Sequence, residues 1–195
     1  MTNHLWWYIA RSGGIVAWVM LAISMFWGLA LSSRFLGKRP KPNWMLDLHR
    51  FVGGFATVFT VIHVVSLLFD NYLTFTVTNL LVPFTGSYHT VAVAWGVIAL
   101  YMLVAVEITS LLRKRLSKRA WRLTHSLSFP LFALATFHLL WVGSDRTTPL
   151  LRIGVLTAVA AVCVATVMRL IQADRDEIAA MNAPPKPPRI PPISR

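Results

Sequence analysis

Residues 51–69 have the sequence FVGGFATVFTVIHVVSLLF, a stretch of 19 residues without a charged side chain. A helix needs about 20 largely apolar residues to cross the hydrocarbon core of a bilayer. Inside hydrocarbon the backbone amides must be bonded within the segment itself, which favours a helix. The stretch lacks the alternation of apolar and polar residues that is typical of a membrane-barrel strand. It therefore predicts a transmembrane helix whose apolar core contains one histidine, His63.

Four further apolar runs flank this stretch. Each is long enough to span a bilayer once its flanks are included; their uncharged cores are Ile15–Leu31, Val91–Val106, Leu127–Gly143 and Ile153–Met168. Composition agrees, because 56% of the 195 residues are hydrophobic and only 13% are charged, whereas a soluble domain carries about a quarter charged residues. We predict an all-α integral membrane protein with a bundle of five transmembrane helices. A sixth, short segment is left open, either at the N-terminus or in the interface.

Basic residues are concentrated on one side of this predicted topology. Of the 19 Lys and Arg residues, 16 lie between helices 1 and 2, between helices 3 and 4, or after helix 5. The positive-inside rule therefore predicts an external N-terminus and a cytoplasmic C-terminus in a multi-pass protein of the inner or plasma membrane. Membrane topology explains the net charge of +12, so we expect lipid and not nucleic acid as the partner. The 16 residues are Arg34, Lys38, Arg39, Lys41, Arg50, Arg113, Lys114, Arg115, Lys118, Arg119, Arg122, Arg169, Arg175, Lys186, Arg189 and Arg195.

Two regions lie outside the predicted spans. The outer connection 71–88 carries no charge, and its Leu80–Phe84 stretch is expected either in the interface or folded over the outer end of the bundle. The C-terminal region contains six prolines between residues 184 and 192, a composition typical of an extended, flexible segment. We expect residues 1–172 to form the transmembrane bundle and residues 173–195 a cytoplasmic, proline-rich flexible tail.

Four of the six histidines form two sets on the second and fourth predicted helices. His49 and His63 are 14 residues apart, and His125 and His138 are 13 apart. Because the two helices run in the same direction, His49 should lie level with His125 near the cytoplasm and His63 level with His138 nearer the outside. A rise of 1.5 Å per residue separates the two levels by about 20 Å. Two haem groups would fit, because imidazole is a good axial ligand for haem iron.

The spacing on the fourth helix is a geometric obstacle to this arrangement. At about 100° per residue, 14 residues return to within about 40° of the same face, whereas 13 residues miss it by about 140°. His125 and His138 can face one direction only if the helix is irregular between them. Pro130 lies in that interval, and proline removes a helical hydrogen bond and kinks the axis. We therefore predict a kink or local unwinding around Ser126–Pro130.

Weaker candidates flank the histidines. Gly53 and Gly54 would let a macrocycle approach the helix backbone, although plain helix packing explains them equally well. Arg50 and Arg122 could bind haem propionates, although the positive-inside rule also accounts for them. Glu107, at the cytoplasmic end of the third helix, is expected to be interfacial.

Two segments carry a resemblance to a known family: LHRFVGGFATVFTVIHV (Leu48–Val64) and WRLTHSLSFPLFALATFHLLW (Trp121–Trp141). They resemble the ferric reductase-like transmembrane domain family, which includes the membrane parts of ferric reductases and NADPH oxidases and the haem-binding subunit of the bacterial methionine sulfoxide reductase system. WWYIARSGGIVAWVMLAIS (Trp6–Ser24) and LVPFTGSYHTVAVAWG (Leu81–Gly96) look like its bacterial branch.

The resemblance implies two bis-histidine b haems, an inner one on His49 and His125 and an outer one on His63 and His138. It also implies electron flow from the cytoplasmic side outward. The family commonly has six helices, and this chain shows five.

The expected function is that of a membrane cytochrome b, the electron-transport component of an oxidoreductase without catalytic acid–base residues. Residues after the fifth run contain no glycine-rich nucleotide motif, so we expect a separate donor: a cytoplasmic flavin reductase or flavoprotein, or a quinol. The acceptor would be an external acceptor or redox protein. One alternative is a single-haem membrane subunit serving a periplasmic or extracellular oxidoreductase. Another is a structural membrane protein without a cofactor.

Overall fold

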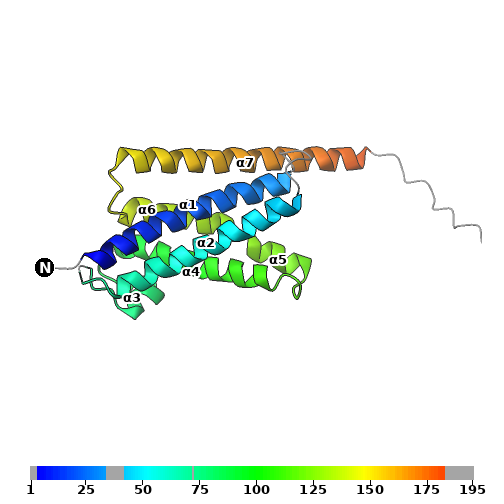
Figure 1. Cartoon of the computed structure of the whole chain (residues 1–195). Coiled ribbons are helices and arrows are strands. Elements are labelled where there is room, and N and C mark those ends of the chain that lie inside the picture. The colour runs from blue at the N-terminus through cyan, green and yellow to red at the C-terminus, as the bar shows by residue number, and fades with distance from the viewer. Residues whose placement is uncertain (1–3, 34–41, 72, 183–195) are drawn as a thin grey trace, which may run out of the picture.

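The computed structural model describes residues 4–33, 42–71 and 73–182, and the regular elements in these ranges are all helices (Figure 1). They are α1 (Leu5–Ser33), α2 (Pro42–Leu68), α3 (Val77–Leu81), α4 (Thr90–Leu111), α5 (Lys118–His125), α6 (Ser128–Val142) and α7 (Pro149–Met181). The all-α prediction is confirmed. The prolines of the predicted tail lie outside the described residues.

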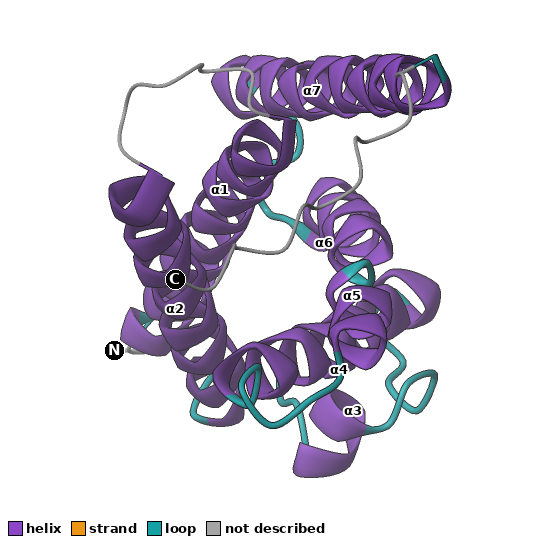
Figure 2. Cartoon of the chain, turned by 90° about the vertical axis from the view of Figure 1, so that its right-hand side faces the viewer, coloured by secondary structure: helices purple, strands orange, loops and turns teal. Residues whose placement is uncertain are grey.

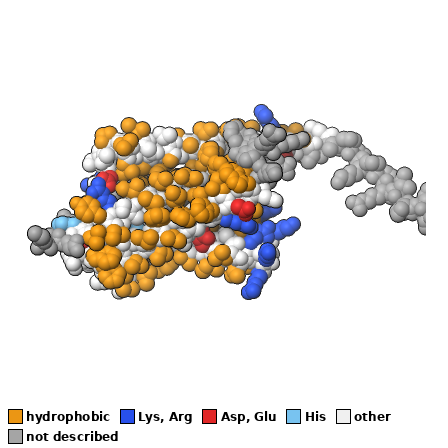
Figure 3. Space-filling view, viewed as in Figure 1, with side chains coloured by type: hydrophobic (Ala, Val, Ile, Leu, Met, Phe, Trp, Pro, Cys, Tyr) orange, Lys and Arg blue, Asp and Glu red, His pale blue; other side chains and the backbone are white. Residues whose placement is uncertain are grey.

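Five segments are long and apolar enough to cross a membrane: α1, α2, α4, α5 together with α6, and α7. They contain the five apolar runs found in the sequence, so the five-span prediction is confirmed. Large apolar side chains are exposed along them, as at Phe51, Ile153 and Leu156, which are 61%, 63% and 68% exposed. Figure 3 shows an apolar belt with charged side chains toward the two ends. This pattern suits a bundle solvated by lipid, which has no need of a polar surface.

Four of the spans form a ring, which Figure 2 shows in a view down the bundle. Helix α1 packs mainly on α2, and α4 packs mainly on α6; contacts between α1 and α6 join the two pairs. Helix α7 lies outside the ring against α1. The two histidine-bearing spans, α2 and α5–α6, therefore face each other across the interior of the ring.

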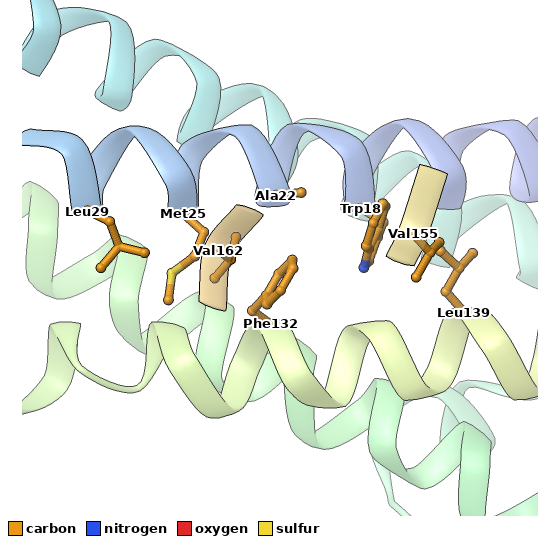
Figure 4. Packing of buried hydrophobic residues seen from close by; sticks show 8 residues of the cluster. All are labelled: Trp18, Ala22, Met25, Leu29, Phe132, Leu139, Val155 and Val162. Carbon is orange, nitrogen blue, oxygen red and sulfur yellow. The ribbon is translucent and has the colours of Figure 1, made fainter. Parts of the chain in front are cut away.

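A core cluster joins α1, α6 and α7 and holds one side of the ring together (Figure 4). The Trp18 and Phe132 rings are stacked, with centroids 6.0 Å apart and planes 23° apart. The indole N–H of Trp18 donates a hydrogen bond to the hydroxyl of Thr136 at 3.0 Å. A buried indole N–H is costly without an acceptor, so this bond fixes the register of α1 on α6. The cluster consists of Trp18, Ala22, Met25, Leu29, Phe132, Leu139, Val155 and Val162.

The fourth span is interrupted where the sequence predicts it. Helix α5 ends at His125 and α6 begins at Ser128. The Phe129 N–H donates to the Ser126 carbonyl at 3.2 Å, three residues back. That carbonyl is free because Pro130, which would bond to it in a regular α-helix, has no N–H. The predicted unwinding around Ser126–Pro130 is confirmed.

The outer connection packs against α4 outside the ring (Figure 2), and its Leu81, Val82 and Phe84 side chains are exposed. Leu80, in α3, is buried and lines an interior cavity. The Tyr101 hydroxyl, on α4, donates to the Leu81 carbonyl. At five residues, α3 is too short to span a bilayer.

Helix α7 is one continuous helix through Met181. Residue 172, the predicted end of the bundle, lies inside it. Residues 173–181 therefore continue the fifth span as helix, and the part of the predicted tail that lies outside the described residues is 183–195.

Candidate functional site: two facing histidine pairs

The inner pair joins α2 to the end of α5. The His49 and His125 ring centroids are 6.1 Å apart, with planes at 77°. The outer pair joins α2 to α6, and the His63 and His138 centroids are 6.3 Å apart, with planes at 78°. The structure thus brings together both pairs that the sequence predicted.

These separations fit one metal ion between the rings of each pair. A metal–imidazole bond is about 2.0 Å long and the ring centroid lies about 1.1 Å beyond the nitrogen, so two rings on opposite sides of one metal have centroids about 6.2 Å apart. No group of three or more His, Cys, Asp or Glu side chains forms a metal site among the described residues. Each pair therefore offers two protein ligands, which suits an iron ion whose other ligands come from a planar macrocycle.

Backbone carbonyls hold three of the four imidazoles by their Nδ1 atoms. His63 Nδ1 lies 2.6 Å from the Ala10 carbonyl, and His138 Nδ1 lies 2.8 Å from the Ala92 carbonyl. His49 Nδ1 lies 3.1 Å from the carbonyl of Ser24 and 3.2 Å from its hydroxyl. Since a carbonyl only accepts, Nδ1 carries the proton and Nε2 keeps the lone pair. This is the tautomer that a metal ligand requires, and the partner raises ligand basicity.

A glycine on the neighbouring helix gives each of these three rings its space. A Cβ placed on Gly14 would lie 2.9 Å from His63 Nδ1, and one on Gly28 would lie 3.1 Å from His49 Cε1. A Cβ on Gly96 would lie only 2.6 Å from His138 Nδ1. The missing side chain lets each ring lie against the helix and reach a carbonyl.

The accepting carbonyl is four residues before the glycine in all three cases: Ala10 before Gly14, Ser24 before Gly28, and Ala92 before Gly96. A small residue four positions before a glycine is a common device for close helix contact in membranes. Sequence reasoning missed these residues. The sequence contains a pattern that could have identified two of them: Gly14 and Gly28 are 14 residues apart, and His49 and His63 on the antiparallel helix have the same spacing.

His125 is held differently. Its ring is stacked on Trp121, with centroids 5.0 Å apart and planes 17° apart. The guanidinium of Arg113 lies over the same Trp121 ring, 4.5 Å from its centroid. The Nδ1 atom of His125 is buried and has no hydrogen-bond partner. Its position at the last residue of α5, before the break, accounts for the difference, because the unwound segment turns the ring toward His49.

An interior cavity extends from the outer end of the bundle past the outer pair. Its volume is about 200 Å³. Trp7, Arg11 and Asp145 line it at the outer end, and Leu21, Leu103 and Leu131 line it near mid-membrane. His63 and His138 both line it. Apolar walls with a few polar groups are the usual lining of a ligand site.

The mouth of this cavity is closed on one side by an ion pair that sequence reasoning did not single out. The Arg11 guanidinium, on α1, binds both carboxylate oxygens of Asp145 in the α6–α7 connection. Arg11 also lies over the Trp7 ring, 5.0 Å from its centroid. This pair ties α1 to the outer end of α6.

The weaker predicted residues lie around the inner pair. Arg50 and Arg122 are exposed, and Arg50 forms a loose ion pair with Asp47 at 3.8 Å. A Cβ on Gly54 would meet nothing within 4 Å, whereas one on Gly53 would lie 3.3 Å from a Glu107 carboxylate oxygen. Glu107 is therefore directed at α2 and is only partly exposed.

The fold and the site together define a multi-pass helical membrane protein with two facing histidine pairs in its interior. The sequence model of the family described as ferric reductase like transmembrane component matches residues 13–136, and the chain belongs to this family. The matched region includes His49, His63 and His125 and ends two residues before His138. No curated protein and no solved structure matches the chain. Transmembrane domains of this family generally bind haem, and they suggest a membrane electron-transfer component.

Proposed function

We propose that this protein is a membrane cytochrome b that carries single electrons across the bilayer through two haem b groups. His49 and His125 hold the inner haem, and His63 and His138 hold the outer one. The observation that carries this proposal is the separation of the two ring pairs, 6.1 Å and 6.3 Å. Both match the separation of two imidazoles on one metal.

The chain's own residues prepare the ligands. The carbonyls of Ala10, Ser24 and Ala92 keep the proton on Nδ1, so that Nε2 of three imidazoles keeps the lone pair that a metal ion needs. Bound haem would supply reversible one-electron reduction of its iron. Two imidazoles bound to one haem iron would leave no position for a substrate, which suits electron transfer. The cavity beside the outer pair has mostly apolar walls, which would give this part of the path a low dielectric constant.

Arg50 and Arg122 are proposed to bind the propionates of the inner haem, and Gly53 and Gly54 to leave room for its macrocycle. The donor is proposed to be a flavin reductase, a flavoprotein or a quinol on the basic, cytoplasmic side. The acceptor is proposed to be an external redox protein or small oxidant. What supports this direction is the positive-inside rule applied to 16 of the 19 basic residues.

An absorption spectrum of the protein, purified after expression with ample haem, tests this function. Dithionite reduction should give the sharp α band of b haem, with two haems per chain by extraction. The double variant His63→Ala/His138→Ala should retain one haem, and so should His49→Ala/His125→Ala. His89→Ala, outside both pairs, is the matched control and should retain two.

Other results would overturn the proposal. A colourless protein would indicate a structural membrane protein without a cofactor. One haem in the unaltered chain would indicate a single-haem subunit serving an external oxidoreductase. The pair whose removal abolishes that haem would identify its site.

A further inference from the structure

A second cavity lies between the end of α6 and the start of α7, and neither histidine pair lines it. Its volume is about 410 Å³, a size usual for a small-molecule site. The connection between these two helices lies at the same end of the bundle as the start of α1 (Figure 1). The positive-inside rule predicts that this end is external. The cavity is therefore expected at the level of the external lipid headgroups.

Two arginines line this cavity, although basic residues are scarce at this end of the molecule. Of the 19 Lys and Arg residues, only Arg11, Arg146 and Arg152 lie on the side predicted to be external. Arg11 is paired with Asp145. Arg146 and Arg152 both line the cavity, and in the part of the chain that the structure describes neither of them forms an ion pair. The positive charge left at this end is thus concentrated in one place.

The polar part of the lining suits a phosphate group. Nη1 of Arg146 donates to the Trp141 carbonyl at 3.0 Å, which fixes the guanidinium and leaves its other N–H groups for a ligand. The planar donors of arginine match the oxygens of a phosphate. Arg152 lies near the start of α7, which begins at Pro149 without a side-chain cap from Thr148. The positive end of the helix dipole therefore adds to the charge of the two arginines.

The rest of the lining is apolar and continues onto the surface that would face lipid. Val155 is buried, whereas Trp141 and Leu156 are 51% and 68% exposed. Tryptophan is enriched in membrane proteins at the level of the lipid headgroups. A water-soluble anion gains nothing from such a wall, whereas a phospholipid carries its phosphate directly beside its acyl chains. Both parts of the cavity therefore match one kind of molecule.

We propose that this cavity binds an anionic phospholipid of the external leaflet, with its phosphate between Arg146 and Arg152 and its acyl chains along Trp141 and Leu156. An anionic headgroup such as that of phosphatidylglycerol is preferred to zwitterionic phosphatidylcholine, whose quaternary ammonium places a further positive charge beside the two guanidiniums. The site lies outside both histidine pairs, so this inference does not depend on the proposed function.

Tryptophan quenching by brominated lipids tests the site in the full-length protein. The protein is reconstituted in phosphatidylcholine vesicles that contain an increasing fraction of phosphatidylglycerol brominated in its acyl chains. The signal of Trp141 is the difference between the unaltered protein and Trp141→Phe. Half-maximal quenching of this signal should need an about 25-fold lower fraction of brominated phosphatidylglycerol than of brominated phosphatidylcholine, because each arginine beside an anionic headgroup strengthens binding about fivefold.

Charge-removing variants locate the preference. Arg146→Gln and Arg152→Gln should each reduce it about fivefold, and the double variant should be quenched equally by the two lipids. Arg169→Gln/Arg175→Gln is the matched control, because it removes two exposed positive charges from the other end of the same helix. This control should keep the full preference. Inorganic phosphate should not change the preference when it replaces chloride at equal ionic strength.

Four results would overturn the proposal. The first is equal quenching of Trp141 by the two lipids in the unaltered protein. The second is an undiminished preference in Arg146→Gln/Arg152→Gln. The third is an equal loss in the control, which would indicate general attraction of a basic protein to an anionic membrane. The fourth is loss of the preference in inorganic phosphate, which would show that the cavity takes a free anion. None of these results involves haem, so each would leave the proposed function standing.

Discussion

Replacing Gly96 by alanine is the sharpest test of the outer histidine site. An alanine Cβ at this position would lie 2.6 Å from Nδ1 and 2.7 Å from Cε1 of His138. Non-bonded heavy atoms of this kind are comfortable at about 3.5–4.0 Å, so the ring must retreat by about 1 Å. The 2.8 Å bond from Nδ1 to the Ala92 carbonyl would then lengthen beyond the limit of a hydrogen bond.

The cost follows from these distances. A buried N–H left without an acceptor costs about 1–3 kcal/mol, and at 1.4 kcal/mol per factor of ten this corresponds to a loss of haem affinity of about 5- to 150-fold. Measured losses on removing the partner of a metal-bound histidine, about 10- to 100-fold, agree with this range. We expect Gly96→Ala to lose most of its outer haem.

The assay is haem titration into the purified apoprotein, with circular dichroism to show that the variant keeps its helices. A series of glycine variants provides internal controls. The loss of affinity should fall in the order Gly96→Ala, Gly14→Ala, Gly28→Ala, because the distance from the added Cβ to the nearest histidine atom lengthens from 2.6 to 2.9 to 3.1 Å. Gly154→Ala, on α7, meets nothing within 4 Å and should bind haem as the unaltered protein does.

Normal outer haem affinity in Gly96→Ala would refute the reasoning. It would mean that the ring of His138 does not lie against α4 when haem is bound. A loss of similar size in Gly154→Ala would be equally damaging, since it would show that any added methyl group disturbs the bundle.

Three further predictions concern the bundle. Pro130→Ala should let α5 and α6 join into a regular helix and turn His125 about 140° away from His49, so haem extraction should find only the outer haem. Pro149→Ala, at the start of α7, is the control and should keep both haems. Two haems in Pro130→Ala would argue against the helix break as the reason why His125 faces His49. Thr136→Val leaves the indole N–H of Trp18 without its acceptor and should reduce the free energy of unfolding by about 1–3 kcal/mol in a detergent unfolding titration. Thr157→Val, at an exposed position, is the neutral control, and equal midpoints for the two variants would contradict the role of the Trp18 bond. Asp145→Asn breaks the ion pair with Arg11 and should lower the free energy of unfolding by about 1 kcal/mol or less, with a smaller effect at high salt. A loss of stability that does not depend on salt, measured by thermal unfolding, would show that the two side chains act through packing.

Much of this molecule is determined locally, and the sequence predicts those parts well. Five uncharged runs of spanning length give five spans because a backbone in hydrocarbon must satisfy its own hydrogen bonds. The depth of each histidine follows from the fixed rise of a helix. The break before α6 follows from the mismatch between a 13-residue spacing and the helical period, together with Pro130, whose missing N–H frees the Ser126 carbonyl.

Other features depend on which helix lies against which, and this information is not local. The apolar runs are uniformly hydrophobic, so their composition does not say that α1 packs on α2, α4 packs on α6, and α7 lies outside the ring. Only that arrangement puts Gly14 beside His63 and Gly96 beside His138. The stack of His125 on Trp121 is local, since the two residues are one turn apart in α5. Only the pairing of the helices decides that the other three imidazoles meet a carbonyl of a neighbouring helix.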